Sequence, residues 1–480
     1  MHLISIYGEA LSMKSCNDKL VALRKLVQGP VFTANTPGYD EEVSVFNMAV
    51  RHRPALVLGA ANPADVATAV KFASRHGLNI AVLNTGHGPS VAADANTLMI
   101  TTRRMRGIDI NARRRTARIE AGVRFGELAE AAANHDLAPL AGSSPGVGVV
   151  GYTLSGGASS TMGRKYGWAA DHVIGIDLIT ADGQTHRVSA ASEGDLFGAL
   201  LGGKGNFGVV TAMEFTLFPV TRLYAGGLFY SGRHTRQVLE AYIKLCASAP
   251  NELTTSLALL NFPALPGLPV FMQGKLTVSL RVSYIGDDHE GARWIEPMRQ
   301  AAPVLADTVA GMPYARFGSI SDDPTDPAPA VEQFALLREL SLDTIDAIVN
   351  VAGPKSGSSI NIVDIRHLQG AYSRPAPFPN AVGARDAGYA IFALTVVPPG
   401  CDSADYRRCG NELIEAVKPW LHEQTSPSFQ GPNDTTDEGV RRAYDPAVYE
   451  KLRDVKSKYD PHNRFRFTHN IPPRNRHELA

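Results

Sequence analysis

The sequence predicts an α+β protein, and two patterns along its 480 residues lead to this fold class. Up to about residue 220, short apolar strands such as ALVLGA and NIAVLN alternate with helical stretches. One of these, PADVATAVKFASRHG, has Pro63 at its first turn and Gly77 just past its end. After Pro219 come long alternating strands (KLTVSLRVSYI, SINIVDIRHL, AGYAIFALTVV) and amphipathic helices near 235–248, 287–301 and 403–421. The second pattern predicts an antiparallel sheet with helices on one face.

The remaining elements follow in chain order. Residues 15–28 are expected to form a short helix. The segments TLMITT and TARIEAG are expected to form strands, and residues 125–134 are expected to form a helix. The stretch 141–160 is too rich in glycine for a helix interior, so we expect an ordered loop there. Asp182-Gly183 separates two strands and predicts a hairpin turn. The end of the chain, 440–470, reads as a helix followed by the strand-like FRFTHNI.

Composition excludes several classes of protein. Lys+Arg and Asp+Glu both total 47, so no net charge attracts nucleic acid or an anionic membrane. No apolar run reaches the roughly 18–20 residues that a membrane span needs. The N-terminus lacks the pattern of a secretion signal, although Met13 is an alternative start. The four cysteines are scattered without a CxxC pair, which predicts no metal site or disulfide framework and fits a reducing cytoplasm.

Two segments resemble nucleotide-binding motifs but lack a feature that each motif requires. GKGNFG matches GxGxxG, but the strand-like VVTAMEF follows it where a dinucleotide fingerprint must open a helix. GALLGGK resembles a phosphate loop, but Gly205 follows where a Ser or Thr would hold magnesium. An HExxH helix is absent from the sequence.

Three glycine-rich loops, each beside a predicted strand, remain: 84–90, 142–157 and 202–208. The first reads NTGHGPS and places His87 between two glycines. By itself this loop is also consistent with a tight surface turn that carries an incidental imidazole. Backbone amides on such loops can bind a pyrophosphate, and glycines let a planar ring approach the chain. Three loops together therefore predict a bound dinucleotide without a Rossmann unit.

The order TGHGPS, SSPGVGVVGYTLSGG, KYGWAADHVIGIDLITADG and GGKGNFGVVTAMEF resembles the FAD-binding module of the vanillyl-alcohol-oxidase (PCMH-type) superfamily. The tail YDPHNRFRFTHNI is similar to the C-terminal signature of its berberine-bridge-enzyme branch, and IRHLQGAYSRPAPFPNAVGARDAGYAIF to the substrate domain of bacterial members. The resemblance implies a two-subdomain FAD-binding domain at 1–222, with its core at about 50–222. It further implies a substrate-binding domain at 223–422 and a C-terminal segment at 423–480 that returns to the FAD domain.

In that family, the histidine of the first loop carries the flavin covalently through its 8α-methyl group, and the match places this role on His87. Many members add a second tether from a cysteine, but Ser144 stands at that position and cannot form a thioether. The resemblance therefore implies FAD held by one covalent bond. The implied cofactor-binding residues are Asn84, Thr85, Gly86, His87, Gly88, Pro89, Ser90, Ser144, Gly148, Val149, Gly151, Tyr152, Asn206, Gly208, Val209 and Asn470.

The catalytic base is less evident. Related enzymes often carry a Glu or Tyr two residues before an asparagine in the segment preceding the last helix, and here Gly431 precedes Asn433 in that way. An oxidase usually needs a base for the O–H or N–H of its substrate. The candidates are Asp364, Asp434 and Tyr389, with His367 and Tyr284 behind them. Strand alternation places Asp364 with Arg366 on one face, where they either project into the pocket or form a solvated ion pair.

These observations predict a cytoplasmic FAD-dependent oxidase of the berberine-bridge-like class, a monomer or homodimer without nucleic-acid or membrane partners. We expect it to oxidise a small or mid-sized organic compound, such as a polyketide, a sugar or an alkaloid-like secondary metabolite, with O2 as electron acceptor. Two alternatives stay open. The protein could bind and sequester a drug-like metabolite, or it could be a flavin dehydrogenase that does not use O2.

Overall fold

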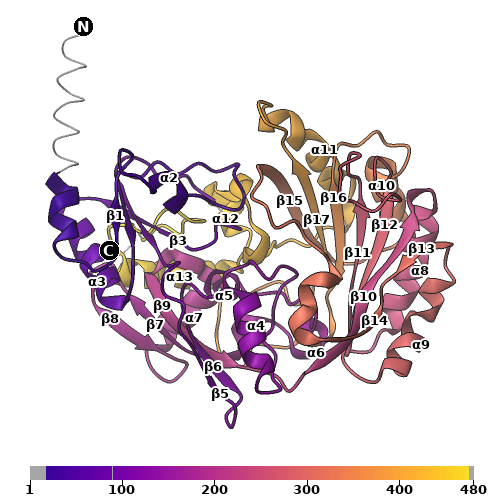
Figure 1. The fold of residues 1–480 in the computed structure, drawn as a ribbon, viewed down its shortest axis with the longest axis horizontal. Helices are drawn as coiled ribbons and strands as arrows, with labels where there is room; N and C mark the ends of the chain where they lie inside the picture. The colour runs from indigo at the N-terminus through magenta and orange to yellow at the C-terminus, as the bar shows by residue number, and fades with distance from the viewer. Residues whose placement is uncertain (1–17, 89, 475–480) are drawn as a thin grey trace, which may run out of the picture.

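A computed structural model describes residues 18–88 and 90–474, and it has two lobes side by side (Figure 1). The N-terminal lobe holds two sheets, and the second lobe holds one large sheet with helices on its outer face. Pro89, Cys16 and Met13 lie outside the described residues. Of the helix expected at 15–28, the structure describes residues 18–24 as helical.

The first sheet positions the loop of His87. Its strand order is β1 (Val31–Phe32), β2 (Leu56–Gly59), β4 (Thr97–Thr101) and β3 (Asn79–Leu83), with β2, β4 and β3 parallel. The crossover helix α3 (Pro63–Arg75) begins at Asn62, whose side chain accepts from the backbone N–H of Asp65. The His87 loop leaves the carboxyl end of β3, the edge of a parallel sheet at which ligands usually bind.

The second sheet is antiparallel, with the order β5 (Ile108–Asn111), β6 (Thr116–Glu120), β9 (Val209–Thr216), β7 (Val173–Ile179) and β8 (Thr185–Val188). The predicted hairpin joins β7 to β8, and Gly183 takes a positive φ of 77° in its turn. Helix α3 packs between the two sheets, because Val66 and Val70 share a core with Ile179 and Val209. Helices α4 (Phe125–Ala133) and α7 (Gly194–Gly203) belong to the same lobe.

The expectation that 141–160 contains no helix is wrong. Residues Val149–Leu154 form the short helix α5, with Gly151 inside it. Four of its six residues, Val149, Val150, Thr153 and Leu154, are buried, so tertiary packing outweighs the cost of a helical glycine, about 1 kcal/mol. A helix therefore begins directly after the glycine-rich turn at 142–148.

The large sheet of the second lobe has the order β13-β10-β12-β11-β16-β17-β15, and β14 also pairs with β10. Its strands are β10 (Arg222–Ser231), β11 (Leu253–Leu260), β12 (Thr277–Tyr284), β13 (Val304–Asp307), β14 (Ala310–Pro313), β15 (Ala330–Leu337), β16 (Ile362–His367) and β17 (Tyr389–Val396). All its pairings are antiparallel. Four helices cover one face (Figure 1): α8 (Thr235–Ser248), α9 (Asp288–Arg299), α10 (Leu342–Ala352) and α11 (Ser403–Ala416). The α+β class is confirmed.

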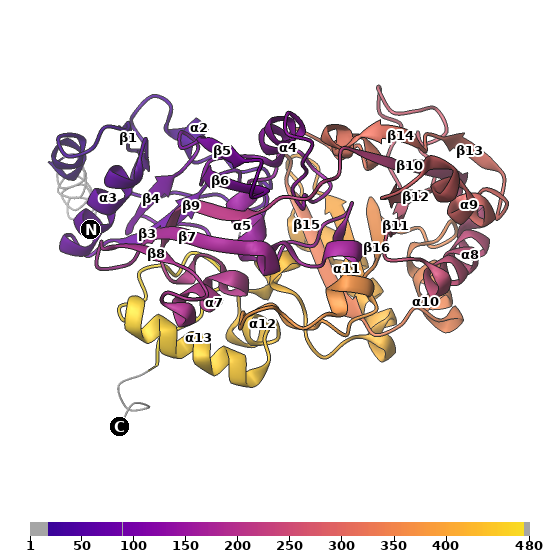
Figure 2. The ribbon, with the colours of Figure 1, turned by 90° about the horizontal axis from the view of Figure 1, so that it is seen from below.

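The C-terminal segment packs on the N-terminal lobe. Helices α12 (Asp437–Arg441) and α13 (Pro446–Tyr459) follow the large sheet, and α13 packs against α7 (Figure 2). The strand-like finish expected at FRFTHNI is wrong, since residues 465–471 are irregular. Side chains hold this tail instead, chiefly those of Lys456, Asp460 and Asn206. Among the described residues, no helix is both long and apolar enough to cross a bilayer.

Candidate active site

Close backbone packing holds the His87 loop. The N–H groups of Phe46 and Asn47 donate to the carbonyls of Thr85 and Gly86. Gly86 has a φ of 67°, and a Cβ at this position would lie 2.5 Å from the Cβ of Val45, so only glycine fits. The Phe46 ring stacks on the imidazole of His87, with centroids 3.9 Å apart and planes 13° from parallel. The imidazole is thus fixed in one orientation.

The surroundings of His87 keep its imidazole neutral. Burial is the main cause that lowers the pKa of His87 to about 4, and the charge of Arg124 adds to it. Asp323 and the backbone of Gly146 oppose this shift only in part. At neutral pH the ring therefore has a nitrogen lone pair available for a covalent bond.

The second glycine loop meets the first one. A Cβ at Gly146 would lie 3.6 Å from Nε2 of His87 and 3.7 Å from Oγ of Ser144, so both side chains border the same small space. A Cβ at Gly148 would lie 2.6 Å from Nδ2 of Asn84, which means that the two loops touch. The backbone N–H of Val149 donates to Val123 and anchors the start of α5. Sequence reasoning placed these two loops at one site, and the structure brings them together.

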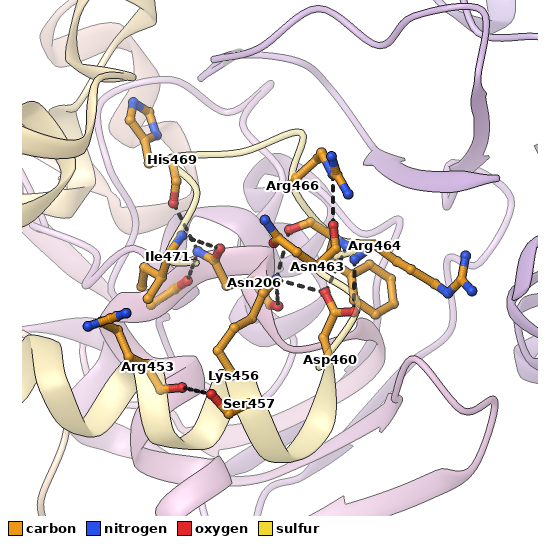
Figure 3. A network of polar contacts seen from close by, with 12 residues as sticks. Asn206, Arg453, Lys456, Ser457, Asp460, Asn463, Arg464, Arg466, His469 and Ile471 are labelled. Atoms are coloured by element: carbon orange, nitrogen blue, oxygen red, sulfur yellow. Dashed lines mark hydrogen bonds and ion pairs between the residues drawn. The ribbon is translucent and has the colours of Figure 1, made fainter. Parts of the chain in front are cut away.

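The third loop holds the C-terminal tail. The Asn206 amide is fully buried; it donates to the carbonyls of Gly203 and His469 and accepts from the N–H of Ile471 (Figure 3). These bonds fix both neighbours of Asn470 and use both N–H groups of the Asn206 amide. A Cβ at Gly208 would meet the carbonyl of Ile179 at 2.5 Å, and Val209 is buried in the core.

A cavity lies between the two lobes on the uncovered face of the large sheet, with an empty volume of about 530 Å³ that includes its open mouth. Hydroxyl-bearing and aromatic side chains dominate its lining. Residues that border it include Ser143, Ser159, Ser160, Trp168, Thr255, Ser256, Arg281, Phe334, Asp364, Arg366, Tyr372, Ser426 and Phe429. Phe429 stacks on Phe334, with centroids 4.5 Å apart, and the Arg366 guanidinium lies 4.9 Å from the Phe429 ring centroid.

Asp364 and Arg366 line this cavity and do not form a solvated surface pair. Asp364 is 2% exposed and accepts from Nε of Arg366 at 2.6 Å and from Nη1 of Arg281 at 3.4 Å. Burial alone would raise the pKa of Asp364, but the two guanidinium groups outweigh it and hold that pKa below its usual value. The carboxylate is thus a stable anion that orients two arginines, and it is a weak proton acceptor. Sequence reasoning missed Arg281, although alternation in KLTVSLRVSYI puts it on one face with Ser279 and Ser283.

The other two candidates for the catalytic base, Tyr389 and Asp434, have different surroundings. Tyr389 stacks on His367, with centroids 5.3 Å apart, and belongs to the core between the sheet and its helices, on the face away from the cavity. Asp434 accepts from the backbone N–H of Gly431 at 3.0 Å in a short 3₁₀ turn, Pro432–Asp434.

Near Asp434, Nζ of Lys204 lies 3.0 Å from Nδ1 of His469, whose Nε2 is 2.9 Å from the Gly431 carbonyl. Burial lowers the pKa of Lys204 to about 7 and that of His469 well below its usual value. A neutral His469 can donate from Nε2 to the carbonyl and accept from Lys204 at Nδ1. Sequence reasoning found neither residue of this pair.

Comparison with known proteins identifies two domains in this chain. Residues 54–189 match the model of the FAD binding domain, and residues 434–472 match the berberine and berberine-like model. The chain is 28% identical to (R)-6-hydroxynicotine oxidase of Paenarthrobacter nicotinovorans, over 93% of this chain and 97% of that protein. It is 26% identical to chitooligosaccharide oxidase of Gibberella zeae, over 93% and 92% of the two chains. The chain thus carries an FAD binding domain and a berberine-like C-terminal segment, and its relatives are FAD-linked oxidoreductases.

Solved structures of similar proteins have the same fold as this FAD-linked oxidoreductase. The fold superposes on 6-hydroxy-D-nicotine oxidase from Arthrobacter nicotinovorans with a TM-score of 0.80, at 25% identity over 93% of this chain and 98% of that one. A chitooligosaccharide oxidase gives a TM-score of 0.81, at 22% identity over 96% and 100% of the chains. The predicted fold family and the prediction of an FAD enzyme are confirmed.

In this FAD-linked oxidoreductase, the residues of the expected cofactor site fit FAD. Several buried polar atoms in the described part of the chain have no hydrogen-bond partner, and among them are Oδ1 of Asn84, the hydroxyl of Tyr152 and Oδ1 of Asn470. They come from three of the segments predicted to contact FAD, and such atoms are costly unless a ligand or water satisfies them. Cβ atoms at Gly88 and Gly151 would meet nothing within 4 Å, so both glycines border open space.

Proposed function

We propose that this enzyme is an oxidase that holds FAD through a single covalent bond to His87. The observation that carries the proposal is the neutral imidazole of His87, stacked on Phe46, with Ser144 in the same small space. An uncharged imidazole is a competent nucleophile, whereas the Ser144 hydroxyl cannot supply a thioether. Asn84, Tyr152 and Asn470 would offer their unpartnered polar atoms to the cofactor.

We propose a small or mid-sized organic substrate in the cavity beside the large sheet. This cavity is a concave space between the two lobes, which is the usual kind of place for a small-molecule site. Serine and threonine hydroxyls suit a substrate with several polar groups, and the Phe334–Phe429 wall suits a planar or ring-shaped one. The relatives named for 6-hydroxynicotine and for chitooligosaccharides support both chemistries. When bound, FAD would take two electrons from the substrate and O2 would take them from FAD.

The covalent bond has a direct test. We expect yellow colour to stay with the acid-precipitated protein, and a proteolytic digest to contain a flavin-bearing peptide that includes His87 and none that includes Ser144. His87→Ala would release its FAD on denaturation, while Ser144→Ala would retain it. Free FAD in the supernatant of the wild-type protein would contradict the proposed bond.

Sequestration of a metabolite is the second candidate function, because Gly431 supplies no side chain where related enzymes often carry a base. Anaerobic bleaching of the flavin by a bound compound, with peroxide formed on admitting air, would support the oxidase. Tight binding without bleaching would support sequestration. Bleaching followed by very slow reoxidation in air would support a dehydrogenase.

A further inference from the structure

Glu332 lies on the cavity face of β15, the edge strand of the large sheet next to β17. Side chains alternate along a strand, so Glu332 projects from the same face as Phe334 and Leu336. Both of these neighbours line the cavity. The strand therefore directs a carboxyl group toward the region where the two lobes meet.

The Glu332 carboxyl lies close to the position that a side chain at residue 431 would occupy. A Cβ built on Gly431 would meet a single atom within 4 Å, and this atom is Oε2 of Glu332, at 3.8 Å. The Asn433 side chain donates to the Glu332 carbonyl at 3.3 Å, so the two segments are joined across about one hundred residues of chain. A carboxylate from a different strand thus occupies the space of the missing side chain.

The same carboxyl is linked to the His87 loop. Nδ2 of Asn47 donates to Oε1 of Glu332 at 3.3 Å. The backbone N–H of Asn47 donates to the carbonyl of Gly86, and the preceding residue, Phe46, stacks on His87. Glu332 is therefore two hydrogen bonds away from the loop that is proposed to carry the flavin.

The surroundings of Glu332 suit a group that gains and loses a proton. Asn47 is its one side-chain donor among the described residues, and no ion pair there involves its carboxyl. Burial is the main cause that raises the pKa of Glu332 to about 7, and the hydrogen bond from Asn47 opposes it. Asp364, in contrast, lies between Arg281 and Arg366 and holds its charge firmly. A base with a pKa near the working pH is the more effective proton acceptor.

We propose that Glu332 is the catalytic base, which takes the proton from the substrate's O–H or N–H group as that substrate is oxidised. This role rests on the proposed oxidase function. The O–H or N–H bond breaks and its proton forms a neutral carboxylic acid on Glu332. When bound, FAD would accept the hydrogen of the neighbouring C–H carbon together with its bonding electron pair, and a C=O or C=N bond would form in the substrate.

The test compares the holoenzyme with Glu332→Gln, which removes the proton acceptor and keeps the shape. Glu339→Gln is the matched control, because Glu339 is exposed just beyond the end of β15. The first readout needs no turnover: infrared difference spectra between pH 5 and 9 record the carboxylic-acid C=O band. We expect wild type and Glu339→Gln to lose a band with a midpoint near pH 7, and Glu332→Gln to lack it. A Glu332 that is already ionised at pH 5.5 overturns the proposal.

The second readout is anaerobic flavin reduction with (R)-6-hydroxynicotine and with a chitooligosaccharide as probes. We expect reduction by an accepted probe to fall about 10²–10⁴-fold in Glu332→Gln and to lose its pH dependence, and Glu339→Gln to match wild type. Reduction in Glu332→Gln within threefold of wild type overturns the proposal. If neither probe reduces the wild-type flavin, neither compound is a substrate, and a Glu332 already ionised at pH 5.5 still overturns the proposal.

Discussion

Replacement of Lys456 by methionine tests whether a buried ion pair holds the C-terminal tail. Lys456 and Asp460 lie one turn apart at the end of α13, and both side chains are fully buried. Nζ of Lys456 donates to Oδ2 of Asp460 at 2.7 Å and to the carbonyls of Asn206 and Phe465 at 2.8 and 3.2 Å (Figure 3). Methionine keeps most of the length of the side chain and removes all three N–H donors.

The expected loss of stability follows from these contacts. Removing one partner of a buried ion pair costs about 3–5 kcal/mol, because the other charge stays buried without compensation. Two carbonyls also lose a donor, but backbone N–H groups of Arg464 and Phe465 still stabilise the Asp460 carboxylate. We therefore expect Lys456→Met to lower the free energy of unfolding by about 4 kcal/mol.

Urea unfolding followed by circular dichroism measures this loss, with Lys451→Met as control, since Lys451 is exposed on the same helix. The control should stay within about 0.5 kcal/mol of wild type. The double variant Lys456→Met/Asp460→Asn removes both charges and should recover part of the loss. A loss below about 1 kcal/mol for Lys456→Met would show that the pair does not hold the tail.

Two further predictions concern the N-terminal lobe. Gly86→Ala should destabilise the protein by about 1–3 kcal/mol, because its Cβ would collide with Val45 at a positive φ, whereas Gly88→Ala faces open space and should leave the urea midpoint unchanged. Equal midpoints for the two variants would contradict this packing. Burial lowers the pKa of His52 to about 4, so the unfolded state binds more protons between pH 6.5 and 4, and stability should fall as the pH falls through this window. His52→Asn keeps an acceptor for the N–H of Ala93 and should flatten the pH profile of the urea midpoint; a slope equal to that of wild type would exclude His52 as its cause.

Local patterns in the sequence predicted much of the candidate site. The run NIAVLN followed by NTGHGPS predicts a strand that ends at a ligand-binding loop, and β3 does end directly before Asn84. Alternation in SINIVDIRHL separates Asp364 and Arg366 from Val363 and Ile365, because successive side chains on a strand point to opposite faces. These properties depend on neighbours in the chain and need no knowledge of the fold.

Tertiary structure decided which groups meet. Alternation defines two faces of β16, but only packing against the four helices shows that Val363 and Ile365 face the core and Asp364 faces the cavity. Glu332 and Gly431 are about one hundred residues apart, and no local pattern connects them. Sequence alone predicted the glycine loops and most of the strands, since these follow from residue types at short spacing, and the resemblance to a known family implied the type of cofactor. The pairing of an empty glycine position with a distant carboxylate depends on long-range strand order, which only the folded chain specifies.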